Sequence, residues 1–360
     1  MKHPSSKTLK NTLLIAGSIG LVSIGATVLR PQGFGPRWRQ FLAKDAIATA
    51  PITSPEQSIL PIEITGPLAN RDSEVSSLAW YADYLILLPQ YPETLGNNIF
   101  ALPKADIVAA MANENAAPLE PIAIPFNAPD FAEQIDGYEG FEAIAFRGNQ
   151  AYMTIEVETR DAAKGYVLTG TIDSDLTEFV VDPTQQVESL ALATSPNKAD
   201  EAILLTEDQI VSIYEVSGQR LTPEPEMHTF DYSLAPRPSI PFPNIEYRIT
   251  DATELDENNR FWVINYFFSG DRDLLPERDP LTIRYGRGET HRQYQSVERL
   301  IELAYSDSGI TLTNTPPIQL ELVEAERNWE GIARLDNDGF LIITDKFPET
   351  ILGFVAKPDA

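Results

Sequence analysis

The sequence predicts an all-β protein of the β-propeller class with small helical insertions, preceded by an N-terminal hydrophobic helix. Short runs rich in Val, Ile, Leu, Phe and Tyr recur along the chain, bounded by Asp, Asn, Gly or Pro. One polar-apolar pattern also repeats, as expected when each blade contributes one equivalent unit. We expect about five to seven blades, with six as the expected number. Two packed β-sandwiches are the alternative architecture.

The strand signals begin after residue 77 and continue to the end of the chain. The expected strands are 78–88, 151–157, 166–172, 202–206, 209–214, 261–268, 319–323, 340–344 and 351–355. Turn signals at Gly148-Asn149, Asn258-Asn259 and Asn337–Gly339 favour hairpins between neighbouring strands.

Two segments show helical signals. Pro103 precedes residues 104–113, and proline suits a helix start because the missing N–H has no partner there. Residues 296–304 place Val297, Leu300, Ile301 and Ala304 on one helical face.

Charge divides the chain into a basic leader and an acidic body. The whole sequence has 27 basic and 53 acidic residues and a net charge of −26. An acidic protein lacks the basic face that attracts phosphate backbones, so a nucleic-acid partner is not expected.

The absence of cysteine excludes disulfides, thiolate metal sites and thiol nucleophiles.

Residues 12–29 are uncharged and flanked by Lys10 and Arg30, so residues 1–30 are interpreted as a signal anchor or a signal peptide. A span of this length is just enough to cross a hydrocarbon core. Ser23–Gly25 is a candidate cleavage site, and a buried core helix is the third interpretation. We favour the anchor and expect an extracytoplasmic protein, membrane-anchored or secreted. Residues 31–72, rich in Pro and Gly, are interpreted as a tether, and 73–357 as the propeller domain.

The repeats place acidic residues at the ends of the expected channel-lining strands. Because carboxylates gathered in a channel repel one another, they favour a bound cation or protons. Ca²⁺ prefers several oxygen ligands, which makes it the expected cofactor. The predicted metal ligands are Glu139, Glu156, Glu188, Asp251, Glu330 and Asp345. Alternatively, each acid caps its own turn.

An arginine-rich insertion supplies candidate anion-binding groups. Six arginines lie between residues 272 and 299, and guanidinium groups can hold an anion in bidentate fashion. If the insertion covers the channel mouth, the predicted substrate-binding residues are Arg284, Arg287, His291 and, beyond the insertion, Lys346. Pairing with six nearby acidic residues is the alternative. No catalytic residue is identified.

Several motifs resemble the "esterase-like activity of phytase" family. They are NWEGIA at 328–333, FLIITDK at 340–346, YEGF at 138–141, VERLIEL at 297–303 and ALPK at 101–104. The resemblance covers roughly residues 73–357. It implies an exported propeller related to calcium-dependent phytases, acting as a phosphoesterase-like or esterase-like hydrolase on a small-molecule ester.

Two other functions are open. One is a non-catalytic propeller that binds a ligand or protein at the cell surface, favoured by the incomplete phosphate site. The other is a lactonase-like hydrolase, since such propellers also use a channel Ca²⁺. The absence of a G-x-S-x-G motif makes any esterase activity metal-based rather than serine-based.

Overall fold

The computed structural model describes residues 53–113, 115–158, 163–193 and 198–358. The chain separates into two units, Met1–Thr49 and Ala50–Ala360, and all of the described residues belong to the second. The predicted hydrophobic helix lies outside the described residues. Within them, no helix has the length and apolarity of a membrane span.

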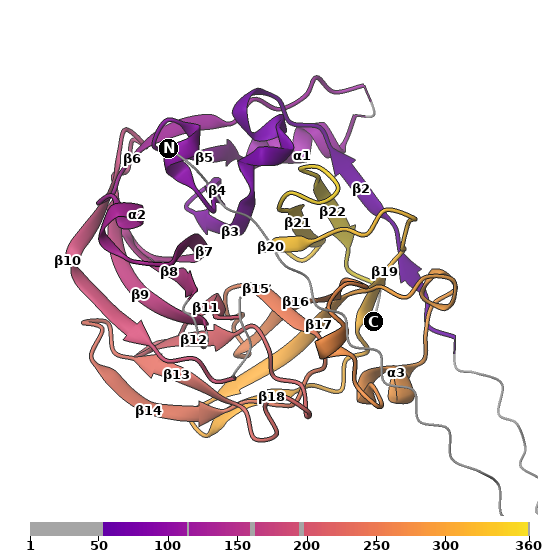
Figure 1. The fold of residues 1–360 in the computed structure, drawn as a ribbon. Coiled ribbons are helices and arrows are strands. Elements are labelled where there is room, and N and C mark those ends of the chain that lie inside the picture. Colours follow the sequence, from indigo (N-terminus) through magenta and orange to yellow (C-terminus); the bar gives the residue numbers. More distant parts are fainter. Residues whose placement is uncertain (1–52, 114, 159–162, 194–197, 359–360) are drawn as a thin grey trace, which may run out of the picture. The chain divides into compact units, whose positions relative to one another are not determined.

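The described strands form four hydrogen-bonded sheets, one of which comprises two blades joined at their outer strands, and together they give five blades in a closed ring (Figure 1). The first three blades each contain four consecutive strands. Blade 1 has β3 (Val75–Tyr81), β4 (Tyr84–Pro89), β5 (Asn98–Pro103) and β6 (Ile122–Asn127). Blade 2 has β7 (Tyr138–Arg147), β8 (Gln150–Glu158), β9 (Ala163–Ile172) and β10 (Phe179–Ser189). Blade 3 has β11 (Asp200–Leu205), β12 (Ile210–Tyr214), β13 (Glu226–Phe230) and β14 (Pro236–Pro241).

The last two blades are completed by strands from the beginning of the described chain. Blade 4 has β15 (Arg248–Ala252), β16 (Arg260–Phe267), β17 (Val297–Ser306), β18 (Gly309–Leu312) and β19 (Ile318–Leu320), with β1 (Glu56–Gln57) parallel to β19. Blade 5 has β20 (Trp329–Leu335), β21 (Gly339–Thr344) and β22 (Leu352–Ala356), with β2 (Ile59–Ile62) antiparallel to β22. Strands from both ends of the domain therefore share one blade.

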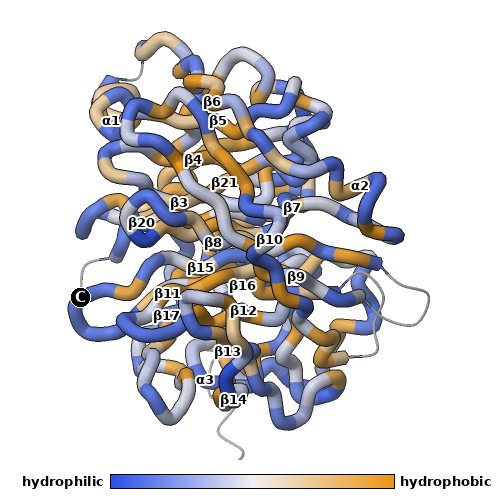
Figure 2. Tube along the Cα trace, turned by 90° about the vertical axis from the view of Figure 1, so that its left-hand side faces the viewer, coloured by the Kyte–Doolittle hydropathy of each residue, from blue (hydrophilic) through white to orange (hydrophobic). Residues whose placement is uncertain are grey.

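The first strand of each blade lines the middle of the ring. β3 contacts β7, β7 contacts β11, β11 contacts β15, β15 contacts β20, and β20 returns to β3. Five apolar clusters fill the five seams between neighbouring blades. Figure 2 shows the apolar residues concentrated in the strands. The ring therefore closes with five blades, within the expected range of five to seven but one fewer than the favoured six, because the fifth inner strand packs against the first.

Few helices interrupt the blades. The α-helices are α1 (Lys104–Met111), α2 (Phe131–Gln134) and α3 (Pro280–Tyr285). The 3₁₀ helices are η1 (Gly66–Ala69), η2 (Arg71–Ser73), η3 (Pro92–Leu95), η4 (Arg272–Leu274) and η5 (Thr290–Arg292). The helix predicted after Pro103 is confirmed as α1.

Three sequence predictions differ from the structure. Residues 78–88 form two strands, since Ala82 takes a left-handed conformation in the turn between them. Residues 296–304 belong to β17, not a helix. This strand lies between β16 and β19 and is buried on both faces, so its pattern does not alternate. Finally, the predicted tether 31–72 contains β1 and β2, which the prolines obscured. Pro61 is tolerated because β2 is an edge strand.

Candidate functional site

All five inner strands contain a β-bulge at the same step of the blade. The pairing register shifts between Val75 and Ser77, Phe141 and Ala143, Asp200 and Ala202, Ile249 and Ala252, and Trp329 and Gly331. A bulge leaves a residue out of the ladder and redirects its side chain. The shift skips one residue in four blades and two, Thr250 and Asp251, in the fourth blade, where Thr250 directly follows the last paired residue. The residues at this position, here called the bulge ring, are Ser76, Glu142, Glu201, Thr250 and Glu330. The ring therefore presents three carboxyls and two hydroxyls, one from each blade.

The carboxyls of the bulge ring lie close enough to influence one another. Burial raises the pKa of Glu201, and the charges of Glu142 and Glu330 raise it further. Burial likewise raises the pKa of Glu142 well above its usual range, with Glu156 and Glu330 adding to the effect. Glu142 and Glu201 are 4% and 7% exposed. Side chains from three blades thus converge on one buried acidic region, at what we call the bulge end of the channel.

The two hydroxyls of the ring are held by the next blade. Ser76 Oγ donates to the Phe141 carbonyl at 2.6 Å, and Thr250 Oγ1 donates to the Trp329 carbonyl at 2.6 Å. In both cases the acceptor precedes a ring glutamate. These bonds fix the hydroxyl protons and leave the oxygen lone pairs able to accept or to ligate.

A second group of charged side chains lies beside the ring. Burial, followed by the charge of Glu215, raises the pKa of Glu156 to about 8, while Lys198 and Arg248 oppose the rise. Arg248 is ion-paired with both Glu215 and Asp271, the latter at 2.6 Å. Lys198 Nζ lies 3.7 Å from Glu215 Oε2. One buried oxygen of Glu156 and one of Glu215 accept no hydrogen bond. The Glu215 oxygen still has the charge of Lys198 nearby, whereas a buried oxygen such as that of Glu156 is costly without a partner and favours a polar ligand at this end.

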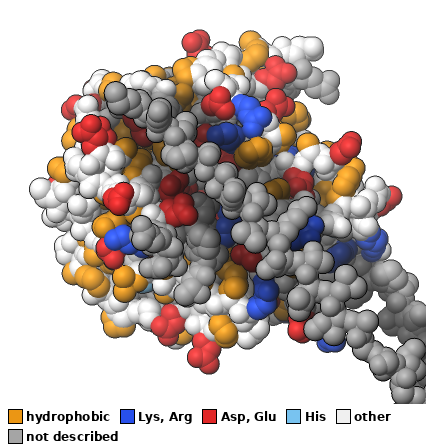
Figure 3. Space-filling view, viewed as in Figure 1, with side chains coloured by type: hydrophobic (Ala, Val, Ile, Leu, Met, Phe, Trp, Pro, Cys, Tyr) orange, Lys and Arg blue, Asp and Glu red, His pale blue; other side chains and the backbone are white. Residues whose placement is uncertain are grey.

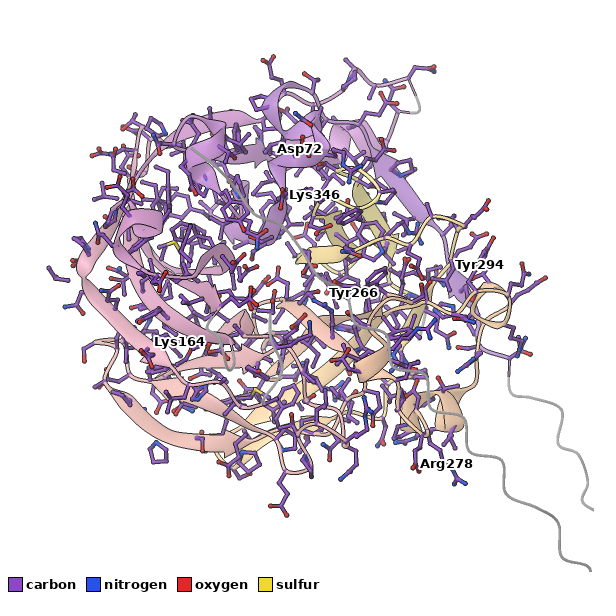
Figure 4. All side chains as sticks on the ribbon, viewed as in Figure 1. Asp72, Lys164, Tyr266, Arg278, Tyr294 and Lys346 are labelled. Atoms are coloured by element: carbon purple, nitrogen blue, oxygen red, sulfur yellow. The ribbon has the colours of Figure 1, made fainter. Side chains whose placement is uncertain are left out.

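Glu330, the ring member from blade 5, also lies near a further acidic residue, Asp345. Tyr266 Oη donates to Glu330 Oε1 at 3.0 Å, and Figure 4 shows Tyr266 near the middle of the ring. Burial raises the pKa of Glu330, and the charge of Asp345 raises it further. Asp345 accepts the backbone N–H of Phe347 at 2.9 Å.

The six predicted metal ligands are placed in three different ways. Glu156, Glu330 and Asp345 lie at the bulge end, and Glu139 is near enough for its charge to raise the pKa of Glu156. Asp251 is buried and accepts from backbone and hydroxyl donors, three of them on the inner strands of two other blades, so it links blades rather than capping its own turn. Glu188 lies on β10, the outermost strand of blade 2, paired with Lys164 at 2.7 Å. The structure therefore does not bring Glu188 to the channel.

The predicted substrate-binding residues do not gather at the channel. Arg284 bonds Asn314 Oδ1 at 2.9 Å, and the Arg287 carbonyl accepts from Ser54 beside β1. His291 Nδ1 lies 2.7 Å from Glu56 Oε1, which also joins this insertion to β1. Since β1 is at the outer edge of blade 4, the insertion covers that edge and not the channel mouth. Figure 4 shows Arg278 of the same insertion far from the middle of the ring.

Lys346 differs from the other three. Its ammonium group pairs with Glu74, which precedes β3, and it lies nearer the middle of the ring than Arg278 (Figure 4). Figure 3 shows further Lys and Arg side chains on the side of the visible face where α3 lies. The basic side chains that lie at the bulge end are Arg248 and Lys198, which both contact Glu215.

Sequence reasoning missed Glu142, Glu201, Glu215 and Arg248. The signal for the first two was a triplet of a polar residue, a short side chain and an apolar residue. It recurs as Ser76–Leu78, Glu142–Ile144, Glu201–Ile203, Thr250–Ala252 and Glu330–Ile332. When the repeats are aligned on Glu139 and Glu188, the pattern in blade 2 starts three residues before Glu142. The next repeat then falls on β10, the last strand of blade 2, instead of on β11 of blade 3.

The oxygen atoms of the bulge ring are of the type that a hard cation binds, but the side chains that carry them are not arranged around one cation position. Carboxylates and hydroxyls are oxygen ligands of the kind that Ca²⁺ prefers. Among the described residues, no group of three or more His, Asp or Glu side chains is arranged to hold a metal ion. The ring glutamates would therefore have to rotate toward the channel axis to share one.

The raised pKa of Glu156 predicts a pH-dependent stability. In the unfolded chain its pKa returns to about 4.3, so the folded state holds the proton to higher pH. The stabilisation is present below the unfolded pKa and is lost as pH rises through about 8. We expect the Tm to fall between pH 5 and 8 in the native protein and to fall less in Glu156→Gln. Thermal unfolding across this range checks this, and parallel curves would contradict it.

No family model and no curated protein matches this sequence, so the resemblance to the phytase-like esterase family rests on the motifs alone. Solved structures give low similarity. A xylan β-1,4-xylosidase from Bacillus halodurans C-125 aligns with a TM-score of 0.47 and 8% identity, over 82% of this chain and 54% of its own. A mutant α-L-arabinanase from Cellvibrio cellulosa gives 0.42 and 11%, over 78% and 90%. A glucose dehydrogenase gives 0.39 and 11%, over 81% and 99%. At these values the likeness carries no conclusion about what this chain does.

Proposed function

We propose that the bulge end of the channel binds a divalent cation, Ca²⁺, and that the protein is an ester hydrolase acting there. The observation that carries the proposal is the bulge ring, in which the inner strand of every blade contributes one oxygen-bearing side chain at its bulge. Turn capping alone does not require this repetition. When bound, a cation at this position would polarise a carbonyl oxygen and lower the pKa of water.

The charges around the ring favour an uncharged substrate. A phosphate group entering the channel would meet Glu142, Glu201 and Glu330, while the arginine insertion lies at the outer edge of blade 4. A carboxylic ester or a lactone does not suffer this repulsion. We therefore favour an ester or lactone over the phosphoester that the family resemblance suggests.

The surrounding residues have separate tasks in this proposal. Glu156 retains a proton near neutral pH and can transfer it to a leaving group. Arg248 pairs with Glu215 and fixes its position. Tyr266 orients Glu330 through the 3.0 Å hydrogen bond. Export and membrane attachment through residues 1–30 belong to the same proposal and rest on the leader sequence.

The first test is calcium binding followed by thermal unfolding. We would strip the full chain with chelator and titrate Ca²⁺, with Na⁺ at matched ionic strength as the salt control. At 100 times the Kd, binding to the native state stabilises it by about 2.7 kcal/mol. We expect a saturable rise in Tm that Glu142→Gln combined with Glu201→Gln abolishes. The matched control is Glu188→Gln, an acid outside the channel, which should retain the rise.

The second test is hydrolysis by the calcium-loaded protein. A panel of aryl esters, lactones and aryl phosphates separates the three substrate classes. We expect turnover of an ester or lactone that the double variant loses. Calcium binding without turnover would favour a non-catalytic binding propeller, and the absence of any Tm shift would remove the cation site.

A further inference from the structure

The far end of the axial channel is a cavity of a different character. Its volume is about 260 Å³, and it is lined mainly by apolar side chains of four blades, among them Leu78, Trp80, Ile144, Phe146, Leu205 and Leu255. Leu78 and Ile144 lie two residues beyond ring members Ser76 and Glu142 on their strands. We call this the hairpin end, because the inner strands turn there into the second strands of their blades.

One lining residue of this cavity is charged. Glu254 follows β15, is exposed, and makes no ion pair within the described residues. Two cations lie near Glu254 and lower its pKa, which desolvation raises, but their side chains pair with other carboxylates. Lys104 pairs with Asp336 at 2.6 Å, and Arg334 lies 3.7 Å from Asp256 while its guanidinium also reaches backbone carbonyls. Neither cation forms an ion pair with the Glu254 carboxylate, so a ligand ammonium group at the cavity mouth would compete only with their longer-range charge.

The aromatic walls are held in place. Trp80 Nε1 donates to the Arg334 carbonyl at 2.6 Å, which joins blade 1 to blade 5 and fixes the indole. Phe146 packs against Tyr81 with ring centres 5.4 Å apart. Preformed apolar cavities with a single well-placed polar group are typical small-molecule sites. Aromatic faces beside a carboxylate also attract cations, and the ammonium group of Lys104 already lies 5.6 Å from the centre of the Trp80 ring.

We propose that the hairpin end binds a small organic cation, a primary amine carrying an aromatic or alkyl body. The body fills the cavity between Trp80 and Phe146, and the ammonium group pairs with Glu254. This site is separate from the bulge end, and the proposal does not depend on calcium binding or hydrolysis.

The test uses 2-phenylethylamine as the probe, with 2-phenylethanol and phenylacetate as neutral and anionic analogues. Ligand-observed NMR saturation transfer to the full chain measures binding without relying on activity. We expect saturable binding of the amine, at least tenfold weaker binding of the alcohol, and weaker binding still of the acid. Tryptophan fluorescence gives a second readout. Trp80→Phe leaves Trp38, Trp262 and Trp329 in place, so a fluorescence change that this variant loses is assigned to the cavity.

The decisive variant is Glu254→Gln, which keeps the shape of the side chain and removes its charge. We expect it to weaken amine binding at least tenfold while leaving the Tm unchanged. Glu257→Gln, an exposed acid in the turn that follows, is the matched control and should bind as the native protein does. Equal binding of amine and alcohol, equal binding by Glu254→Gln, or no binding of the amine would each overturn the proposal.

Discussion

A chain that begins at Ser73 should fail to form a stable ring, although the composition of residues 31–72 suggests a dispensable tether. Removing β2 exposes the edge of β22, and removing β1 leaves β19 with one fewer partner. Ile62 and Leu68, which are 5% and 0% exposed, are lost from the seam between blades 1 and 5. Burial of one such side chain contributes about 1.5–3 kcal/mol.

The same deletion removes a buried polar contact. Glu56 accepts the backbone N–H groups of Thr290 and His291 at 3.0 and 3.1 Å, in addition to its contact with the His291 ring. Summed with the lost apolar contacts, this loss is comparable to the whole stability of a typical domain, about 5–15 kcal/mol.

Urea unfolding followed by circular dichroism measures the effect of the deletion. A chain that begins at Thr53 is the control and should unfold in one cooperative transition. We expect the chain from Ser73 to show no such transition, and a synthetic peptide of residues 53–72 to restore it in part. Cooperative unfolding of the shorter chain at the same urea midpoint would show that the closing strands are not needed.

Asp251→Ala should be the most destabilising single substitution at the channel, by about 3–5 kcal/mol. Asp251 is 2% exposed and accepts from Ser77 Oγ, Leu78 N and Ile332 N at 3.2, 3.3 and 2.9 Å. These donors belong to β3 and β20, and Asp251 itself belongs to β15. One carboxylate therefore ties together the inner strands of blades 1, 4 and 5, and its removal leaves buried donors without acceptors.

Equilibrium unfolding in urea gives the free energy of each variant. Asp251→Asn retains one acceptor oxygen and should cost less than the alanine substitution. Asp336→Ala removes an exposed carboxylate paired with Lys104, and exposed ion pairs contribute about 0.2–1 kcal/mol. A cost for Asp251→Ala no larger than that of this control would refute its role as a link between blades.

The sequence by itself determined the local elements and the kind of chemistry. Short apolar runs and turn residues located most strands, the Pro103 signal located α1, and the acidic repeats indicated a carboxylate-lined channel containing Glu156 and Glu330. These features depend on residues near one another in the chain, whose preferences are set by strand period, turn conformation and charge.

The tertiary structure decided the number of blades, the closing strands and the membership of the site. A bulge is a property of the register between two strands, so the ring role of Glu142 and Glu201 is visible only when each inner strand is paired with its neighbour. The pattern of β17 failed as a sequence signal because burial on both faces removes the alternation, and its charged residues are balanced by distant partners such as Arg327 and Asp279. Ring closure also depends on which surfaces pack together, and this is why residues 56–62, so far from β19 and β22 in sequence, complete the last two blades.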